Sequence, residues 1–532
     1  MHPVHNGDVS RSRTDRRTFI RVLAAAGAAA ARPVFAGQAP AIVTAEADRP
    51  RMPQGVASGD VSMDRAVIWS RADRPARMFV EYSTTEQFEN VRRVPGPAAL
   101  ETSDFTSRVV LTGLPEGQRI FYRVLFQDLA DIRRWSLPAP GSFSTPPSAG
   151  RARNVTLAWS ADTAGQGWGI NTEWGGLRLY ETMRAAEPDV FIHCGDTIYA
   201  DGPLVAEVKL DDGRVWKNIV TPAKSKVAET LDEYRGNYKY NLLDEHMRRF
   251  NSEVPQIVIW DDHEVRDNWY WERNLEKDQR YQAKSAALLA ARGRCAFLEY
   301  NPLMIDADDP ERVYRSIHYG SPVDVFAIDL RSYRGANSDN RQTTLDERSA
   351  LAGAEQIASL KASLAASRAT WKVIASDMPI GLVVSDGAHY EAIANAEPGA
   401  PLGRELEIAS LLRFIRDRRI RNVVWVTGDV HYCAAHHYHP SRAKFTEFAP
   451  FWEFVAGPLN AGTFGPNALD PTFGPEVKFN GVQRGMKANR PPSDGLQFFG
   501  TLTIDARTRA LTAKLRNLAG QTLYSVELAT DR

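Results

Sequence analysis

The chain contains 532 residues, more than one hydrophobic core usually supports, so we expect two or more domains. Hydrophobic residues make up 43% and charged residues 24%, a composition that excludes a disordered or fibrous protein. The 65 basic residues balance the 65 acidic ones, so the net charge argues against nucleic acid as an obligate partner.

Residues 1–36 are predicted to be an export signal that is not part of the fold. Arg16 and Arg17 precede a weakly apolar, alanine-rich stretch at 22–31, and residues 34–36 end in a small-residue cleavage pattern. The paired arginines resemble a twin-arginine signal, which implies the twin-arginine export machinery as a partner and a periplasmic or secreted protein. An ordinary secretory signal or a chance basic tail is the alternative. The apolar stretch is too short and too mild for a stable membrane span.

Residues 37–50 are predicted to be a linker, and residues 51–148 an N-terminal β domain. Short segments rich in β-branched and aromatic residues alternate with turns, for example at 113–117. This pattern is typical of a small β-sandwich of the immunoglobulin or fibronectin kind. The predicted strands are 66–70, 78–82, 106–111 and 121–126.

Residues 151–532 are predicted to form a second, larger domain after a proline-rich hinge at 144–150. Apolar strands alternate with helical stretches, which predicts an α/β core. The predicted strands are 155–159, 190–194, 257–260, 371–375 and 423–427, the predicted helices are 176–186, 230–250, 354–367 and 406–418, and antiparallel strands are expected within 497–527.

Acidic residues and histidines gather where these strands end. Ligands collect at the carboxyl ends of strands in open α/β sheets, and hydrolytic metal centres need several anionic side chains that converge on cations. The sequence therefore predicts a metal centre for hydrolysis. The clusters are Asp162, Gly195-Asp196-Thr197-Ile198-Tyr199, Asp261-Asp262-His263-Glu264 and Gly428-Asp429-Val430-His431.

The segment from Gly195 to Tyr199 carries the sharpest signal. The glycine lets the backbone turn, the carboxylate of Asp196 can bridge two cations, and Tyr199 can bind one of them as a phenolate, a ligand suited to ferric iron. Capping of a helix N-terminus is the alternative role for Asp196, and equally for Asp162.

Together with Asp329-Leu330-Arg331-Ser332-Tyr333-Arg334 and the opening 55–60 of the β domain, these motifs resemble the PhoD-type alkaline phosphatase and phosphodiesterase family, within the calcineurin-like metallophosphoesterases. The resemblance covers nearly all of the chain beyond the signal. It implies a four-layer α/β sandwich, a di- or trinuclear metal site that holds calcium with ferric iron, and hydrolysis of phosphoesters.

The sequence differs from the family pattern at Ser160-Ala161-Asp162, where PhoD enzymes carry Ser-Cys-Gln. A cysteine ligand to iron is therefore missing, and Asp162 supplies the first carboxylate seen in purple acid phosphatases and the wider superfamily. A ferric ion on Tyr199 with a divalent partner, and a pair of divalent ions, are both open.

Other positions take their roles from the same comparison. Asp262 matches a superfamily metal ligand, with a salt-bridged turn as the alternative, and His263 would donate a proton to the phosphate or the leaving group. Asp429 and His431 supply a late acid and imidazole pair of metal ligands. Less specific candidates, with ordinary structural roles as alternatives, are Arg331 and Arg334 as a phosphate clamp, Asp377, Asn268, Cys433, His436, His437 and His439.

No Gly-x-Ser-x-Gly elbow and no Walker loop is found in the sequence, which argues against acyl-enzyme and nucleotide-driven chemistry. We therefore expect an exported hydrolase of phosphate monoesters or diesters in which a metal-activated water attacks phosphorus. The alternatives are a phospholipase D-like phosphodiesterase and a non-catalytic, calcium-binding protein of the cell envelope.

Overall fold

The computed structural model describes residues 46–148 and 152–531. The predicted export signal lies outside these residues. Pro50–Arg532 forms one compact unit. Within the described ranges, no helix has the length and apolar character needed to cross a bilayer.

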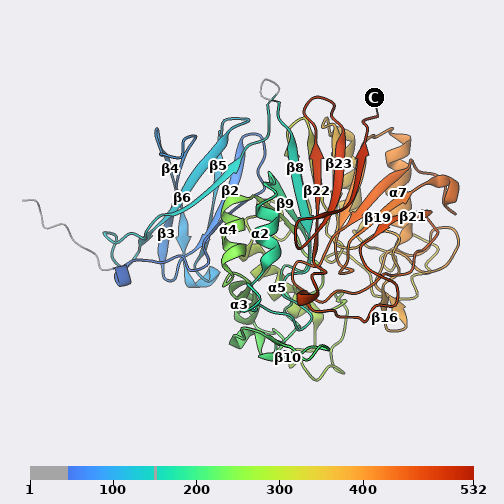
Figure 1. Ribbon diagram of the computed structural model, residues 1–532, viewed down its shortest axis with the longest axis horizontal. Helices are drawn as coiled ribbons and strands as arrows, with labels where there is room; N and C mark the ends of the chain where they lie inside the picture. The colour runs from blue at the N-terminus through green and yellow to red at the C-terminus, as the bar shows by residue number, and fades with distance from the viewer. Residues whose placement is uncertain (1–45, 149–151, 532) are drawn as a thin grey trace, which may run out of the picture. The chain divides into compact units, whose positions relative to one another are not determined.

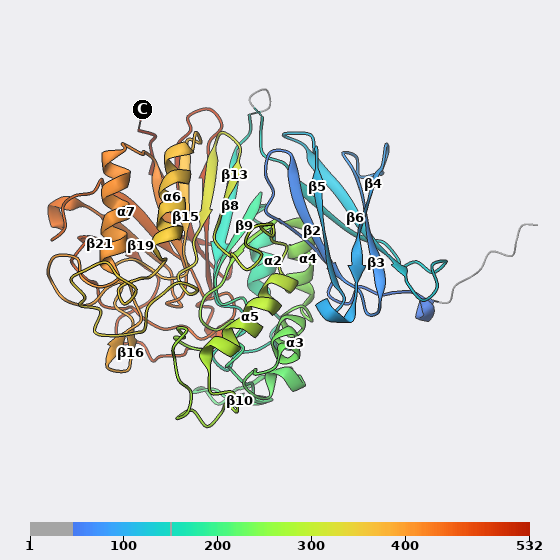
Figure 2. The same ribbon diagram turned by 180° about the vertical axis from the view of Figure 1, so that it is seen from behind.

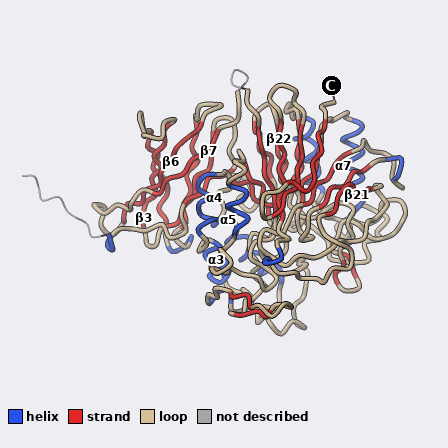
Figure 3. The backbone as a smooth tube through the Cα atoms, viewed as in Figure 1, coloured by secondary structure: helices blue, strands red, loops and turns tan. Residues whose placement is uncertain are grey.

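The fold is built on two large mixed sheets (Figure 1, Figure 3). In the nine-stranded sheet the order is β24 (Thr522–Leu528), β23 (Leu511–Asn517), β22 (Phe498–Ile504), β8 (Val155–Ser160), β9 (Val190–Cys194), β12 (Gln256–Ile259), β1 (Val56–Gly59), β2 (Arg65–Arg71) and β5 (Thr106–Thr112). In the seven-stranded sheet it is β13 (Arg315–Tyr319), β14 (Val323–Ala327), β15 (Trp371–Ala375), β18 (Val423–Thr427), β20 (Phe451–Val455), β19 (Ala434–Tyr438) and β21 (Pro475–Asn480).

Smaller elements complete the described chain. A four-stranded sheet has the order β4 (Arg92–Ala99), β3 (Ala76–Ser83), β6 (Arg119–Asp128) and β7 (Ala139–Ser144). Two hairpins pair β10 (Glu207–Lys209) with β11 (Val215–Lys217) and β16 (Ser385–Asp386) with β17 (His389–Tyr390). The α-helices are α2 (Arg178–Arg184), α3 (Leu231–Asn241), α4 (Glu245–Glu253), α5 (Ala286–Tyr300), α6 (Ala354–Ala366) and α7 (Glu405–Asp417).

The two large sheets pack face to face between helices. Apolar side chains such as Trp159 of the first sheet and Phe454 of the second share one core, because the central strands bury both of their faces. Helices α2 to α5 cover the outer face of the first sheet, and α6 and α7 cover that of the second (Figure 2). This arrangement confirms the predicted four-layer α/β sandwich.

The N-terminal β-sandwich is continuous with the first large sheet. Strands β1, β2 and β5 form one of its layers, and β4, β3, β6 and β7 form the other. Residues Ile68 and Val109 of the first layer share a core with Val80 and Tyr122 of the second. Strand β1 also pairs in parallel with β12 at Gly59, so the sandwich and the α/β core share a sheet.

The single helix predicted at 230–250 is wrong in one respect, because the structure has two helices there. The chain leaves α3 after Asn241 and starts α4 at Glu245. Asp244 causes the break, since its carboxylate accepts hydrogen bonds from the backbone of Met247 and also from that of Leu177. The antiparallel strands expected at the C-terminus are confirmed by β22 and β23, whereas α5 was not predicted.

Candidate metal centre

Two sets of parallel strands end at the same place in the molecule. Strands β8, β9 and β12 are parallel neighbours in the first sheet, and β14, β15 and β18 in the second. Each predicted motif follows one of these strands. Four of the motif residues have positive backbone φ angles, which non-glycine residues adopt rarely and mostly at functional sites: Asp162 (68°), Asp196 (54°), Asp429 (66°) and His431 (60°).

Two glycines allow the turns from different strands to approach closely. Gly195 has a φ of 96°, and a Cβ there would lie 2.5 Å from the Cβ of Asp261. A Cβ on Gly457, which follows β20, would clash with the carboxylate of Asp162. Larger residues at either position would push the acidic side chains apart.

Asp162, Asp196 and His431 form the first group of potential ligands. One ligand atom from each lies within 4.8 Å of the other two, and all three side chains are buried. The Nδ1 of His431 lies 2.5 Å from the carbonyl oxygen of Gly462, an arrangement in which Nδ1 donates and Nε2 keeps its lone pair. That Nε2 lies 2.9 Å from the hydroxyl of Tyr199, which places the phenol at this group.

Asp196, Asp262 and His263 form the second group by the same distance criterion. The ring of His263 stacks on Tyr199 with 4.3 Å between centroids, and its Nδ1 lies 2.6 Å from the carboxylate of Asp201. These contacts orient the ring and direct Nε2 toward Asp262, 3.9 Å away. Asp196 belongs to both groups.

Burial makes this concentration of negative charge unfavourable without cations. Burial raises the pKa of Asp162 and of Asp196 well above the usual range, and the neighbouring Asp262 and Glu264 add to both shifts. Burial also lowers the pKa of His431 to about 4, so this imidazole is neutral at pH 7, as a metal ligand must be.

The donor set fits metal ions. Both carboxylate oxygens of Asp162 are buried and have no hydrogen-bond partner among the described residues. An unpartnered buried carboxylate is strongly disfavoured, so a cation is the natural partner. Oxygen and imidazole donors together suit a di-metal centre of hard or borderline ions. We call Asp162, Asp196, Tyr199, Asp262 and His431 the metal-binding cluster.

The structure does not favour the predicted phosphate clamp of Arg331 and Arg334. Neither side chain has exposed surface, and both guanidinium groups already bind carboxylates. Arg331 donates to Asp261 at 2.6 Å and pairs with Glu391, and its Nε lies 3.4 Å from Asp377. Ion pairing, the alternative interpretation, describes both arginines.

These groups define a second buried cluster beside the first. Arg404, which was not predicted, donates to the backbone oxygen of Glu391 at 2.6 Å. Asp429 belongs to neither potential ligand group of the described residues, and its carboxylate lies 3.9 Å from the Nη2 of Arg331. We call Asp261, Arg331, Arg334, Glu391 and Arg404 the arginine cluster.

Other candidates take ordinary positions. Asp162 and Asp196 are followed by turns and not by helices, which excludes the capping alternative. Cys194 and Cys433 are buried free thiols, as expected of apolar side chains, and His436 pairs with Glu453 at 3.0 Å. Neither potential ligand group of the described residues contains Cys433, His436, His437 or His439.

Sequence reasoning missed two residues that support the centre. Asp201 lies five residues after Asp196, and extending that motif by two positions would have included it. Glu264 was quoted only as part of its motif, yet its carboxylate accepts hydrogen bonds from the backbone of Thr197 at 2.5 Å and of Asp261 at 2.8 Å. It therefore ties the turn after β9 to the turn after β12.

Comparison with known proteins agrees with this geometry. Residues 157–515 match the PhoD-like phosphatase family, and residues 37–147 match the PhoD-like phosphatase N-terminal domain. Alkaline phosphatase D of Bacillus subtilis (strain 168) is 28% identical over 466 residues, which cover 81% of this chain and 74% of that protein.

Solved structures show the same fold. A structure of PhoD matches with a TM-score of 0.65 and 21% identity over 90% of this chain and 89% of its own. A purple acid phosphatase from yellow lupin (Lupinus luteus) seeds matches with a TM-score of 0.55 and 13% identity, over 91% of this chain and 74% of its own. The chain belongs to the PhoD-like phosphatase family and is a metal-dependent hydrolase of phosphoric ester bonds.

Proposed function

We propose that this protein is an exported phosphatase that hydrolyses phosphate monoesters, diesters or both at a di-metal centre. The observation that carries the proposal is the position of Asp196, which belongs to both groups of potential ligands. A carboxylate shared in this way can bridge two cations at the short separation that phosphoester hydrolysis requires.

The metal-binding cluster would hold the ions. Asp162, His431 and Tyr199 face one position and Asp262 the other, with Asp196 between them. We propose Asp429 as a further ligand on the Asp262 side, since the two carboxylates interact electrostatically. When bound, the ions supply Lewis-acid activation of the phosphoester and of the attacking water.

His263 would act as the proton donor to the leaving group. Its Nδ1 is held by Asp201, so Nε2 is the nitrogen available to substrate. Burial opposes the charged form, but Asp201, Asp262 and Asp196 together raise the pKa of His263 well above its usual range. An imidazolium at this position can protonate a departing alkoxide, which is the step that limits esters with poor leaving groups.

The identity of the ions follows from the donors. A phenolate from Tyr199 suits ferric iron, and carboxylates alone suit calcium, so we propose Fe³⁺ beside Ca²⁺. Asp162 would replace the cysteine that PhoD enzymes supply. Iron bound by Tyr199 would give visible absorption, whereas two divalent ions such as calcium would not.

The cellular location is also part of the proposal. The pattern of Arg16, Arg17 and the apolar stretch at 22–31 supports export through the twin-arginine route to the periplasm or medium. Fusing residues 1–36 to a reporter, with Arg16 and Arg17 either kept or replaced by lysine, tests the route. Export that persists with both lysines would indicate an ordinary secretory signal.

The activity is tested on the purified protein. Metal content is measured by plasma mass spectrometry, and hydrolysis of p-nitrophenyl phosphate and of bis-p-nitrophenyl phosphate is assayed on the same sample. We expect bound metal, turnover of at least one substrate, and loss of both metal and turnover in Asp196→Asn. The ratio of the two rates gives the preference for monoesters or diesters.

Asp324→Asn is the matched control. Asp324 is also a buried aspartate of a strand, but it pairs with His318 and Ser367 away from the metal-binding cluster. Its loss should leave metal content and turnover intact. Full turnover by a metal-free Asp196→Asn protein would overturn the proposal.

A further inference from the structure

A hollow of about 500 Å³ lies at the edge of the second sheet where β15 and β18 begin. Lys372 of β15 and Asn422, the residue before β18, line it. The same two strands lead at their other ends to Asp377 and Asp429. At about 3.3 Å per residue, five residues of β15 separate the hollow from the metal-centre edge by about 16 Å.

The lining of this hollow is strongly basic. Its charged members are five cations and one acid: Lys372, Arg418, Arg419, Arg421, Arg509 and Asp531. The whole chain is neutral, so this excess is local. We call this site the basic hollow.

Most of these cations have no acidic partner. Arg418 lies over the ring of Phe414 at 5.6 Å, and Arg509 donates to the hydroxyl of Ser321 at 3.4 Å. Within residues 46–148 and 152–531, no carboxylate forms an ion pair with Arg418, Arg419 or Arg421. Arg418, Arg419 and Arg421 are exposed and lie within four residues of the chain, so their charges repel one another and favour a bound anion.

Helix ends do not balance this charge. Helices α6 and α7 both end beside the basic hollow, at Ala366 and Asp417. Each carboxyl end contributes about half a negative charge, and Asp324 beside Lys372 contributes one more, so together with Asp531 they leave an excess of about two positive charges.

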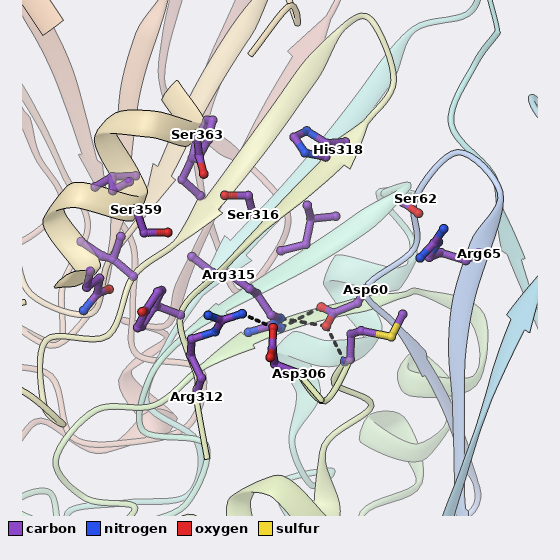
Figure 4. A pocket seen from close by; sticks show the side chains of 18 of the residues that line it. Asp60, Ser62, Arg65, Asp306, Arg312, Arg315, Ser316, His318, Ser359 and Ser363 are labelled. Atoms are coloured by element: carbon purple, nitrogen blue, oxygen red, sulfur yellow. Dashed lines mark hydrogen bonds and ion pairs between the residues drawn. The ribbon is translucent and has the colours of Figure 1, made fainter. Parts of the chain in front are cut away.

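A larger hollow shows the opposite arrangement. It has a volume of about 670 Å³ and lies between the turn after β1, strand β13 and helix α6 (Figure 4). Its charged groups are paired: Arg315 with Asp60, Arg312 with Asp306 and Arg65 with Asp64. Excess charge therefore distinguishes the basic hollow from a mere surface depression.

We propose that the basic hollow binds a phosphate-bearing anion with at least two negative charges. Guanidinium groups match phosphate oxygens with paired hydrogen bonds, and the volume admits a compact ligand. The phosphoryl group could belong to a soluble compound such as pyrophosphate or to the headgroup of an anionic lipid. This site is separate from the metal centre and does not depend on the proposed reaction.

Two probes test the site in the full-length protein. Pyrophosphate is titrated by calorimetry in phosphate-free buffer of low ionic strength, and vesicles of phosphatidylglycerol or of phosphatidylcholine are used in co-sedimentation. We expect binding of pyrophosphate, or retention on the anionic vesicles only, and weaker binding at high salt. Pyrophosphate binding identifies a soluble ligand, and retention on vesicles alone identifies a lipid headgroup.

The double variant Arg419→Gln with Arg421→Gln should weaken the observed binding about tenfold or more, because each lost charge-assisted hydrogen bond contributes substantially. Its hydrolysis of p-nitrophenyl phosphate should stay normal, which shows that it is folded. The matched control is Arg92→Gln, an exposed arginine of β4 in the N-terminal sheet. It should bind like the wild type.

A further variant distinguishes binding of pyrophosphate at the metal centre from binding in the basic hollow. Asp196→Asn should retain the binding that the two arginines provide, since the basic hollow lies at the other edge of the sheet. Absence of binding to both probes, or equal binding by the wild type and the double variant, would overturn the proposal.

Discussion

The metal-binding cluster and the arginine cluster lie side by side and are equally buried, yet they handle charge differently. In the arginine cluster, the carboxylates of Asp261 and Glu391 each meet a guanidinium group. In the metal-binding cluster, the two carboxylate oxygens of Asp162 have no hydrogen-bond partner among the described residues. In the first cluster, arginines of the protein offset the buried carboxylates. In the second, Asp162 has no such partner among the described residues. Burial alone therefore does not identify a functional site, whereas unbalanced buried charge does.

The largest expected effect comes from unbalancing the arginine cluster. Arg331→Met would leave Asp261, Asp377 and Glu391 buried around an apolar side chain. We expect a loss of about 3–5 kcal/mol in the free energy of unfolding, measured by urea denaturation of metal-loaded protein. Arg413→Met, which removes an exposed pair with Glu447, should cost less than about 1 kcal/mol. Equal losses in the two variants would remove the distinction between the clusters.

Asp201 tests how His263, beside the metal-binding cluster, is held in place. Asp201→Asn weakens the hold on His263, so we expect kcat to fall about 10- to 100-fold while KM and metal content change little. The loss should be greater for phenyl phosphate than for p-nitrophenyl phosphate, because the poorer leaving group needs the proton more. A uniform loss for both substrates would instead indicate a purely structural role, and Asp324→Asn again serves as control.

His193 allows the effect of burial on the free energy of unfolding to be measured apart from the effect of neighbouring like charges. Burial lowers its pKa to about 3, and Thr163 is 2.9 Å from its Nε2. An unfolded histidine titrates near pH 6.5, so this contribution to stability is complete above pH 6.5 and is lost as the pH falls toward 3. Between pH 7 and pH 5 the loss amounts to about 2 kcal/mol.

The measurement compares urea unfolding of the wild type with that of His193→Gln at both pH values. Glutamine does not titrate, so the variant should lose less stability on acidification. Parallel decreases in the two proteins would show that His193 does not contribute to the pH dependence.

The smallest expected effect is a slight gain in stability, whereas the other variants are expected to lose stability or activity. Asp162→Asn removes a buried carboxylate that accepts no hydrogen bond from the described residues, so the metal-free variant should be as stable as the metal-free wild type or about 1 kcal/mol more stable. Added metal should stabilise the wild type and not the variant. Thermal unfolding with and without a chelator checks this, and a clear loss of stability in the metal-free variant would contradict the charge imbalance described above.

Much of this centre could be predicted because its residues follow apolar strands at short range. Asp196 and Tyr199 lie within a few residues of β9, and Asp262 and His263 directly follow β12, so the strand pattern locates them. Glu391 could not be found in this way, because it lies in a long irregular segment between β17 and α7 and reaches Arg331 only through the fold. The ion pairs of Arg331 and Arg334 could not be predicted for the same reason, since the direction of an arginine side chain depends on its neighbours in space.

The sequence by itself determined the alternation of strands and helices, the acidic residues at the strand ends and the membership of a phosphatase family. These features depend on local periodicity and short motifs, which contain neighbouring residues only. Tertiary structure decided which acids lie together as potential metal ligands and which pair with arginine. That choice depends on contacts between residues far apart in the chain, such as Asp162 with His431 and Asp261 with Arg331, and it is made only when the two sheets pack together.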